Sequence, residues 1–215
     1  MIAPGSTVLV VDDDPSVREG LTSLLRSTGL RVVAFASGRQ FLQQPHLEFP
    51  ACLVLDIRLP DMDGFDVQRD LLQSGDPMPV IYITGYGDIP MSVRAIKAGA
   101  IEFLTKPFRD EELLAAIRHA LAVHHAARAK RKYTAEICRR LTTLTSRERE
   151  VMEHVVFGLL NKQIAAALGT AEITIKVHRR RVMQKMGAAS LPDLVRMSEN
   201  LARSASRHDA AFAAG

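Results

Sequence analysis

The sequence lacks any apolar stretch long enough to cross a bilayer, and its N-terminus lacks the basic segment and apolar core of a signal peptide. It is also poor in cysteine. Cys52 and Cys138 lie far apart, outside any spacing typical of a metal or redox site. These absences argue against a disulfide-stapled secreted domain and against a membrane partner. We therefore expect a cytoplasmic protein whose two cysteines are reduced.

The composition is that of a globular chain, with 47% hydrophobic and 24% charged residues among 215, a length that suits one or two domains. The formal net charge of +4 hides an asymmetry. Residues 1–123 contain 11 Lys and Arg against 16 Asp and Glu, whereas residues 124–215 contain 17 against 8. An acidic first part and a basic second part indicate two domains, with nucleic acid as the partner of the second.

Short apolar runs alternate with helical patterns through the first 123 residues. Runs without polar interruption are typical of strands buried on both faces of a parallel sheet. We expect strands at 7–11, 31–35, 51–55, 80–84 and 101–104, and helices at 15–27, 38–44, 63–73, 89–98 and from 110 onward. This alternation predicts an α/β fold of the flavodoxin-like (βα)5 type, with strand order 2-1-3-4-5.

Acidic residues follow two of these strands. The first strand leads into Asp12, Asp13 and Asp14, and the third leads into Asp56. In this topology ligands bind outside the carboxyl ends of the strands, where strands 1 and 3 form a crevice. Asp12 and Asp13 would hold a divalent cation, Mg²⁺ or a close relative. Asp14, which precedes Pro15, fits better as a helix cap.

The same crevice gains a hydroxyl from Thr84 and an ammonium from Lys106. A carboxylate can act as a covalent nucleophile toward phosphorus, so Asp56 would be both cation ligand and phosphoryl acceptor. Lys106 would neutralise the incoming charge, and Thr84 would hydrogen-bond a phosphoryl oxygen. Each residue alone has a plainer role, as a helix cap, a loop acid or a surface lysine. Residues at the ends of four expected strands, the first, third, fourth and fifth, point to the same site, and this agreement favours the functional interpretation.

The segments VVDDDPSVREGL, LVLDIRLPDMDG, YITGYGD and AIEFLTKPF resemble the receiver domain of two-component response regulators. The resemblance implies that Asp56 accepts phosphoryl from a sensor histidine kinase, with Mg²⁺ bound by Asp12, Asp13, Asp56 and the backbone carbonyl of Arg58. It further implies that Thr84 and Phe103 act as a switch pair, and that the Lys106–Pro107 peptide is cis. Leu59-Pro60 stands where many receivers have Met-Pro, a near-isosteric change.

The second part of the chain begins with residues 124–143, which are rich in Ala, Arg and Lys and favour a helical linker. Two short helices then follow, about 161–168 and 172–186, joined by a turn that contains Gly169. This pattern is typical of a helix-turn-helix, whose second helix reads the major groove. We expect a receiver at 5–123, the linker at 124–143, an all-α DNA-binding domain at 144–202 and a disordered tail at 203–215.

Residues 143–202, with the segment LTSREREVMEHVVFGLLNKQIAAALGTAEITIKVHRRRVMQKMGAASLPDLV, resemble the four-helix LuxR/NarL-type DNA-binding domain. The resemblance implies base contacts from Lys176, Val177 and Arg180, and makes four further residues candidates for contact with phosphate or sugar: Thr174, His178, Arg179 and Lys162. The segments GDIPMSVRAIKAGAIEFL and NKQIAAALG are similar to the FixJ branch of these regulators, and most closely to the regulators of styrene and toluene degradation.

We interpret the chain as a DNA-binding transcriptional response regulator rather than an enzyme. Phosphorylation would favour a homodimer that binds promoter DNA and acts on RNA polymerase. One alternative is DNA binding independent of phosphorylation, with the receiver serving only as a dimer platform. A second is a phosphotransfer protein or phosphatase, although such a role does not need a basic helix-turn-helix.

Overall fold

The computed structural model of the chain describes residues 6–44, 49, 51–73 and 78–213, with side chains described as far as residue 203. The chain divides into two compact units, Met1–Arg128 and Ala129–Gly215. Within the described part, no helix combines the length and the low polarity that crossing a bilayer requires.

The first unit is built on a parallel sheet in which the strand order is β2-β1-β3-β4-β5. The strands are β1 (Thr7–Val11), β2 (Arg31–Phe35), β3 (Ala51–Asp56), β4 (Val80–Thr84) and β5 (Glu102–Thr105). The helices are α1 (Pro15–Ser27), α2 (Gly38–Leu42), α3 (Gly64–Gln73), α4 (Ile89–Lys97) and α5 (Asp110–Leu141). The flavodoxin-like fold and its strand order are therefore confirmed.

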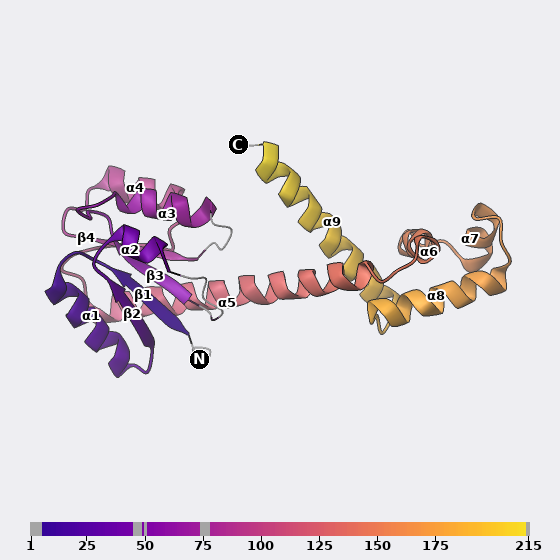
Figure 1. Cartoon of the computed structure of the whole chain (residues 1–215), viewed down its shortest axis with the longest axis horizontal. Coiled ribbons are helices and arrows are strands. Elements are labelled where there is room, and N and C mark those ends of the chain that lie inside the picture. The colour runs from indigo at the N-terminus through magenta and orange to yellow at the C-terminus, as the bar shows by residue number, and fades with distance from the viewer. Residues whose placement is uncertain (1–5, 45–48, 50, 74–77, 214–215) are drawn as a thin grey trace. The chain divides into compact units, whose positions relative to one another are not determined.

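The sheet lies between two layers of helices (Figure 1). Apolar residues of α1 and α5, such as Leu25 and Ile117, pack on one face of the sheet. Residues of α2, α3 and α4, such as Phe41, Val67 and Ala95, pack on the other. Because both faces are covered, the three inner strands are buried along their whole length. That burial explains why their sequences are apolar runs rather than alternating patterns.

The second unit contains α6 (Ser146–Val156), α7 (Asn161–Ala167), α8 (Glu172–Met186) and α9 (Leu191–Ala213) around a core of its own. Ile137, from the last turns of α5, is buried in this core. The segment expected to be a helical linker is thus part of α5, which runs unbroken from Asp110 to Leu141. Its Ala-rich sequence without Gly or Pro favours that continuity.

The chain beyond residue 202 differs from the expected disordered tail. α9 continues to Ala213, and residues 214 and 215 lie outside the described part of the chain. The physical reason is compositional, since residues 203–213 contain no Gly or Pro and four alanines, which favour a helix.

Candidate functional site

Two adjacent strands deliver carboxyl groups to one edge of the sheet. Val11 of β1 pairs with Leu55 of β3, so Asp12 and Asp56 follow neighbouring positions. Asp12 is fully buried, Asp56 is 7% exposed and Asp13 is exposed. One carboxylate oxygen from each of the three lies within 4.8 Å of the others. The acids that the sequence analysis assigned to one crevice therefore come together.

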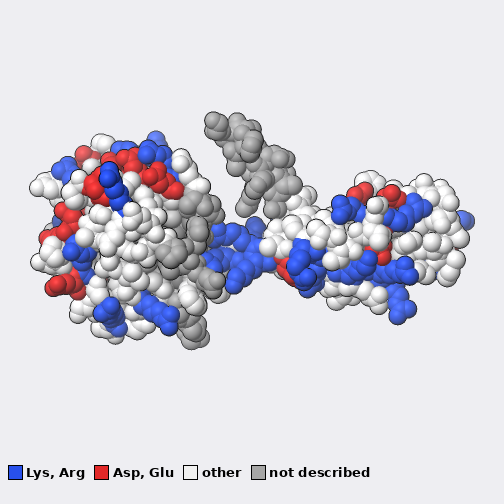
Figure 2. Space-filling model, in the orientation of Figure 1, with Lys and Arg blue, Asp and Glu red and all other residues white. Residues whose placement is uncertain are grey.

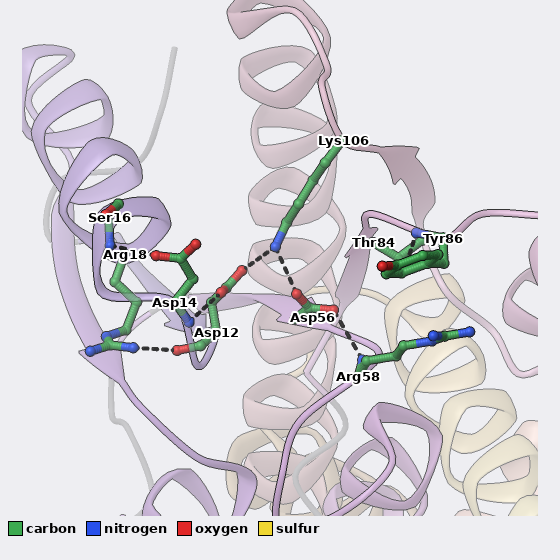
Figure 3. A network of polar contacts seen from close by, with 9 residues as sticks. All are labelled: Asp12, Asp14, Ser16, Arg18, Asp56, Arg58, Thr84, Tyr86 and Lys106. Carbon is green, nitrogen blue, oxygen red and sulfur yellow. Dashed lines mark hydrogen bonds and ion pairs between the residues drawn. The ribbon is translucent and has the colours of Figure 1, made fainter.

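Lys106 connects the two buried carboxylates (Figure 3). Its Nζ donates to Asp12 Oδ2 at 2.5 Å and to Asp56 Oδ2 at 2.7 Å. The loop after β5 carries the lysine, and its position is secured because the Lys106 N–H donates to the Thr84 carbonyl at 2.7 Å. The Lys106–Pro107 peptide is cis, as the family resemblance implied. A residue 50 positions away in sequence thus becomes the direct counter-charge of Asp56.

Burial and pairing act in opposite directions on the charges of this cluster. Burial raises the pKa of the Asp12 carboxyl, and the hydrogen bond from Lys106 offsets only part of that effect. For Lys106, burial alone would lower the pKa of the ammonium, but its hydrogen bonds to Asp12 and Asp56 outweigh burial and raise the pKa. Lys106 is therefore held as a cation at neutral pH.

The loop after β3 presents Asp56 to the crevice. The Arg58 N–H donates to Asp56 Oδ1 at 3.0 Å, so both oxygens of the carboxylate are occupied. Arg58 also forms an isolated antiparallel bridge with Asp63, which folds the loop back. At Gly64 a Cβ atom would lie 2.7 Å from the Asp56 carbonyl oxygen, so the close return of the chain requires glycine.

A hydroxyl and an aromatic ring complete the crevice (Figure 3). Thr84 is buried at the end of β4, and its Oγ1 accepts a hydrogen bond from the Tyr86 N–H at 3.2 Å. The Tyr86 ring is 69% exposed, and the Arg58 guanidinium lies 4.4 Å from its centroid. Phe103 is half-buried on β5, beside Gly87 rather than against the acidic cluster.

The donor set fits a hard divalent cation. Carboxylate oxygens are the ligands that Mg²⁺ prefers, and Mg²⁺ is usually bound by one or two carboxylates together with water and phosphate oxygens. The Asp12, Asp13 and Asp56 oxygens lie close enough together to share one ion. Exposed Asp13 faces solvent, which leaves room for water ligands. Asp14 is not part of the cluster, because its carboxylate accepts from the Ser16 N–H and caps α1, as expected.

The second unit contains the predicted pair of helices, α7 and α8, joined by a turn in which Gly169 has a φ of 60°. Figure 2 shows Lys and Arg side chains gathered over this unit and over part of α5. Three buried side chains attach α8 to the core: Ile175, Val182 and Met186. The opposite side of α8 is open to solvent and carries exposed Lys176, Arg180 and Arg181.

The residues expected to contact DNA differ in how exposed their side chains are and in whether they pair with other residues. Lys176, Val177, Arg180 and, on α7, Lys162 are exposed. Lys176 pairs with Glu172, with 3.1 Å between Nζ and Oε1. Thr174, His178 and Arg179 are half-buried, and the Arg179 guanidinium donates to Asn161 Oδ1 at 3.1 Å. Arg179 therefore connects α8 to α7 in the free protein.

Sequence reasoning missed two contacts that position α8. Lys185 Nζ donates to the buried Glu148 carboxylate at 2.6 Å, and that carboxylate also accepts from the Thr145 N–H in a capping box. Arg140 of α5 donates to the Met186 carbonyl at 2.8 Å, at the end of α8. Glu148 at the third position after Thr145 was a local capping signal, but the lysine and arginine contacts carry no local pattern.

Residues 8–118 match the response regulator receiver domain family, and residues 142–198 match the luxR family of bacterial regulatory proteins. Nodulation protein W of Bradyrhizobium diazoefficiens is 52% identical over 198 residues, which cover 92% of this chain and 87% of that protein. The response regulator protein TodT of Pseudomonas putida is 47% identical, over 91% of this chain and 86% of that protein.

Among solved structures, the low-resolution structure of the response regulator StyR is 48% identical. The match covers 91% of this chain and 98% of that chain, with a TM-score of 0.83. The relatives therefore span both units of this chain rather than one of them.

Proposed function

The chain belongs to the response regulators that join a receiver domain to a LuxR-type DNA-binding domain, and we propose that Asp56 is the residue through which its receiver is switched. It is a DNA-binding transcriptional regulator of the two-component class. The observation that carries the proposal is the bridge that Lys106 makes between Asp12 and Asp56 beside exposed Asp13. The Asp56 carboxylate thus lies beside both the Lys106 ammonium and the oxygens of Asp12 and Asp13.

The proposed reaction is phosphoryl transfer from a phosphohistidine of a sensor kinase. An oxygen of the Asp56 carboxylate attacks phosphorus, so that an O–P bond forms while the P–N bond breaks. The histidine nitrogen takes the electron pair of the broken bond. The product is an aspartyl phosphate, which water later hydrolyses. Asp56 is oriented for attack because Lys106 and the Arg58 N–H hold its two oxygens.

Mg²⁺, when bound, would supply positive charge to the phosphoryl oxygens. Asp12, Asp13, Asp56 and the Arg58 carbonyl would hold it. Lys106 would exchange its contact with Asp56 for one with the phosphoryl group, since its ammonium remains charged. The Thr84 hydroxyl would turn from the Tyr86 N–H toward a phosphoryl oxygen, and Phe103 would follow into the space that Thr84 leaves.

Labelling with radioactive acetyl phosphate tests this assignment. The wild type should incorporate phosphate in the presence of Mg²⁺, and EDTA should abolish incorporation. Asp56→Asn should not be labelled, whereas Asp70→Asn, a control at a surface carboxylate that pairs with neighbouring Arg69 on α3, should be labelled normally. Persistent labelling of Asp56→Asn would show that another residue accepts the phosphoryl group.

For DNA binding by the second unit, we propose that α8 lies in the major groove, with Lys176, Val177 and Arg180 toward the bases. Thr174, His178, Arg179 and Lys162 would contact phosphate or sugar. Lys176→Ala or Arg180→Ala should weaken specific binding, because a good base contact is worth about 1–3 kcal/mol. Arg196→Ala on α9, where the arginine pairs with Asp193, is the matched control. Unchanged affinity and sequence preference in both α8 variants would exclude this helix as the reader.

We propose a phosphorylation-dependent homodimer, formed through the α4–β5 face, as the form that binds promoter DNA and acts on RNA polymerase. Exposed Ile89, Val93 and Ile96 form an apolar stripe at i, i+4 and i+7 along α4, which supports this face. Sedimentation should show a dimer with beryllofluoride and Mg²⁺, and a monomer for Val93→Asp. If DNA binding were identical with and without beryllofluoride, the receiver would act only as a platform.

A further inference from the structure

The solvent face of α8 carries apolar side chains among its cations. One stripe of the helix, at i, i+7 and i+11, is buried: Ile175, Val182 and Met186. Another stripe starts two residues earlier and is exposed throughout: Ile173, Val177, Arg180 and Gln184. Two residues correspond to about 200° of rotation around a helix. The exposed stripe therefore points directly away from the core of the unit.

Packing in the core does not explain why the exposed stripe carries an apolar side chain at Ile173. Its side chain is 67% exposed, more than the 44% of Val177 one turn later. It lies outside the apolar core of its unit, which takes Ile175 instead. Along the exposed face, Lys176 follows Ile173 by about one turn and Arg180 by about two turns, and Glu172 next to Ile173 pairs with Lys176. The exposed face thus has an apolar side chain near its N-terminal end and cations further along it.

The major groove of DNA has the complementary arrangement. Its walls are phosphates, and each thymine on its floor offers an apolar methyl group. In a helix-turn-helix the N-terminal residues of the second helix approach the base edges, and Ile173 is the second residue of α8. We infer that Ile173 contacts a thymine methyl group and sets the base preference at one position of each half-site. This inference rests on the proposal that α8 is the DNA reader.

A thymine-to-uracil scan tests the contact, because uracil lacks only the 5-methyl group. Duplexes bound by the full chain with beryllofluoride and Mg²⁺ are first selected from a random-sequence library. Each thymine of the selected duplex is then replaced by uracil in turn. At one thymine of each half-site, the replacement should weaken wild-type binding about fourfold, the factor for one buried methyl group.

Ile173→Ala should lose the same factor on the thymine duplex and show no further loss on the uracil duplex. Phe157→Ala, which truncates an exposed apolar side chain beyond the end of α6, should keep the wild-type response. The inference alone would be overturned if the wild type lost affinity at no thymine position, or if Ile173→Ala lost as much affinity as the wild type at the thymine to which the wild type responds. If Lys176→Ala and Arg180→Ala also left binding unchanged, the DNA-reading role of α8 would fail with it.

Discussion

The stacked pair of Arg58 and Tyr86 should control how long a phosphoryl group survives on Asp56. The Arg58 N–H donates to Asp56 Oδ1, and the Arg58 guanidinium lies 4.4 Å from the centroid of the Tyr86 ring. The pair lies on one side of the acceptor (Figure 3), and water would reach phosphorus from that side when the stack opens. An exposed cation–π contact is worth about 0.5–1 kcal/mol. Tyr86→Ala should therefore speed hydrolysis about two- to fivefold.

The assay is the loss of label from the phosphorylated chain after acetyl phosphate is removed. Tyr86→Phe keeps the ring face and should retain the wild-type lifetime. Arg58→Ala should match Tyr86→Ala, and the double variant should be no faster than either single variant, because both remove one contact. An unchanged lifetime in Tyr86→Ala, or the same acceleration in Tyr86→Phe, would refute the stacking argument.

Three further predictions concern single side chains. The hydrogen bond from Lys185 lowers the pKa of the Glu148 carboxyl. The ionised carboxylate therefore stabilises the fold above the ordinary glutamate pKa, and this stabilisation is lost as the pH falls through the lowered pKa. The free energy of unfolding, measured with urea, should therefore change less with pH in Glu148→Gln than in the wild type below about pH 4.3. Glu172→Gln should tighten binding to random-sequence duplex DNA about twofold, because it frees Lys176 from an exposed ion pair. Asp14→Ala should lower the free energy of unfolding by about 1 kcal/mol through loss of the α1 cap, with Mg²⁺-dependent labelling intact.

Each of these predictions has a distinct contrary result. An acid unfolding profile of Glu148→Gln that matches the wild type would show that this carboxylate is not coupled to folding. Unchanged anisotropy titrations for Glu172→Gln would mean that its pair with Lys176 does not compete with phosphate. Loss of labelling in Asp14→Ala, with the fold intact by circular dichroism, would place Asp14 among the metal ligands.

The reactive residues of the receiver could be predicted from sequence because they lie at the carboxyl ends of strands or directly after them. The carboxyl ends of parallel strands meet at one edge of a sheet, so the residues just after them converge. Asp12 and Lys106 come just after β1 and β5, and Asp56 and Thr84 are the last residues of β3 and β4. The sequence could not predict that Lys106 would contact both buried carboxylates, nor that Arg58 would stack on Tyr86. These contacts depend on loop conformations that no local pattern specifies.

The second unit shows the same division between pattern and packing. The sequence by itself determined that 172–186 would be a helix and that its cations would lie opposite an apolar stripe, because both follow from the 3.6-residue period. Ile175 belongs to that apolar stripe, whereas only the tertiary structure decided that Ile173, an isoleucine outside the stripe, stays in solvent. Both are isoleucines of one helix, and what separates them is the position of the neighbouring helices that cover one face and leave the other open.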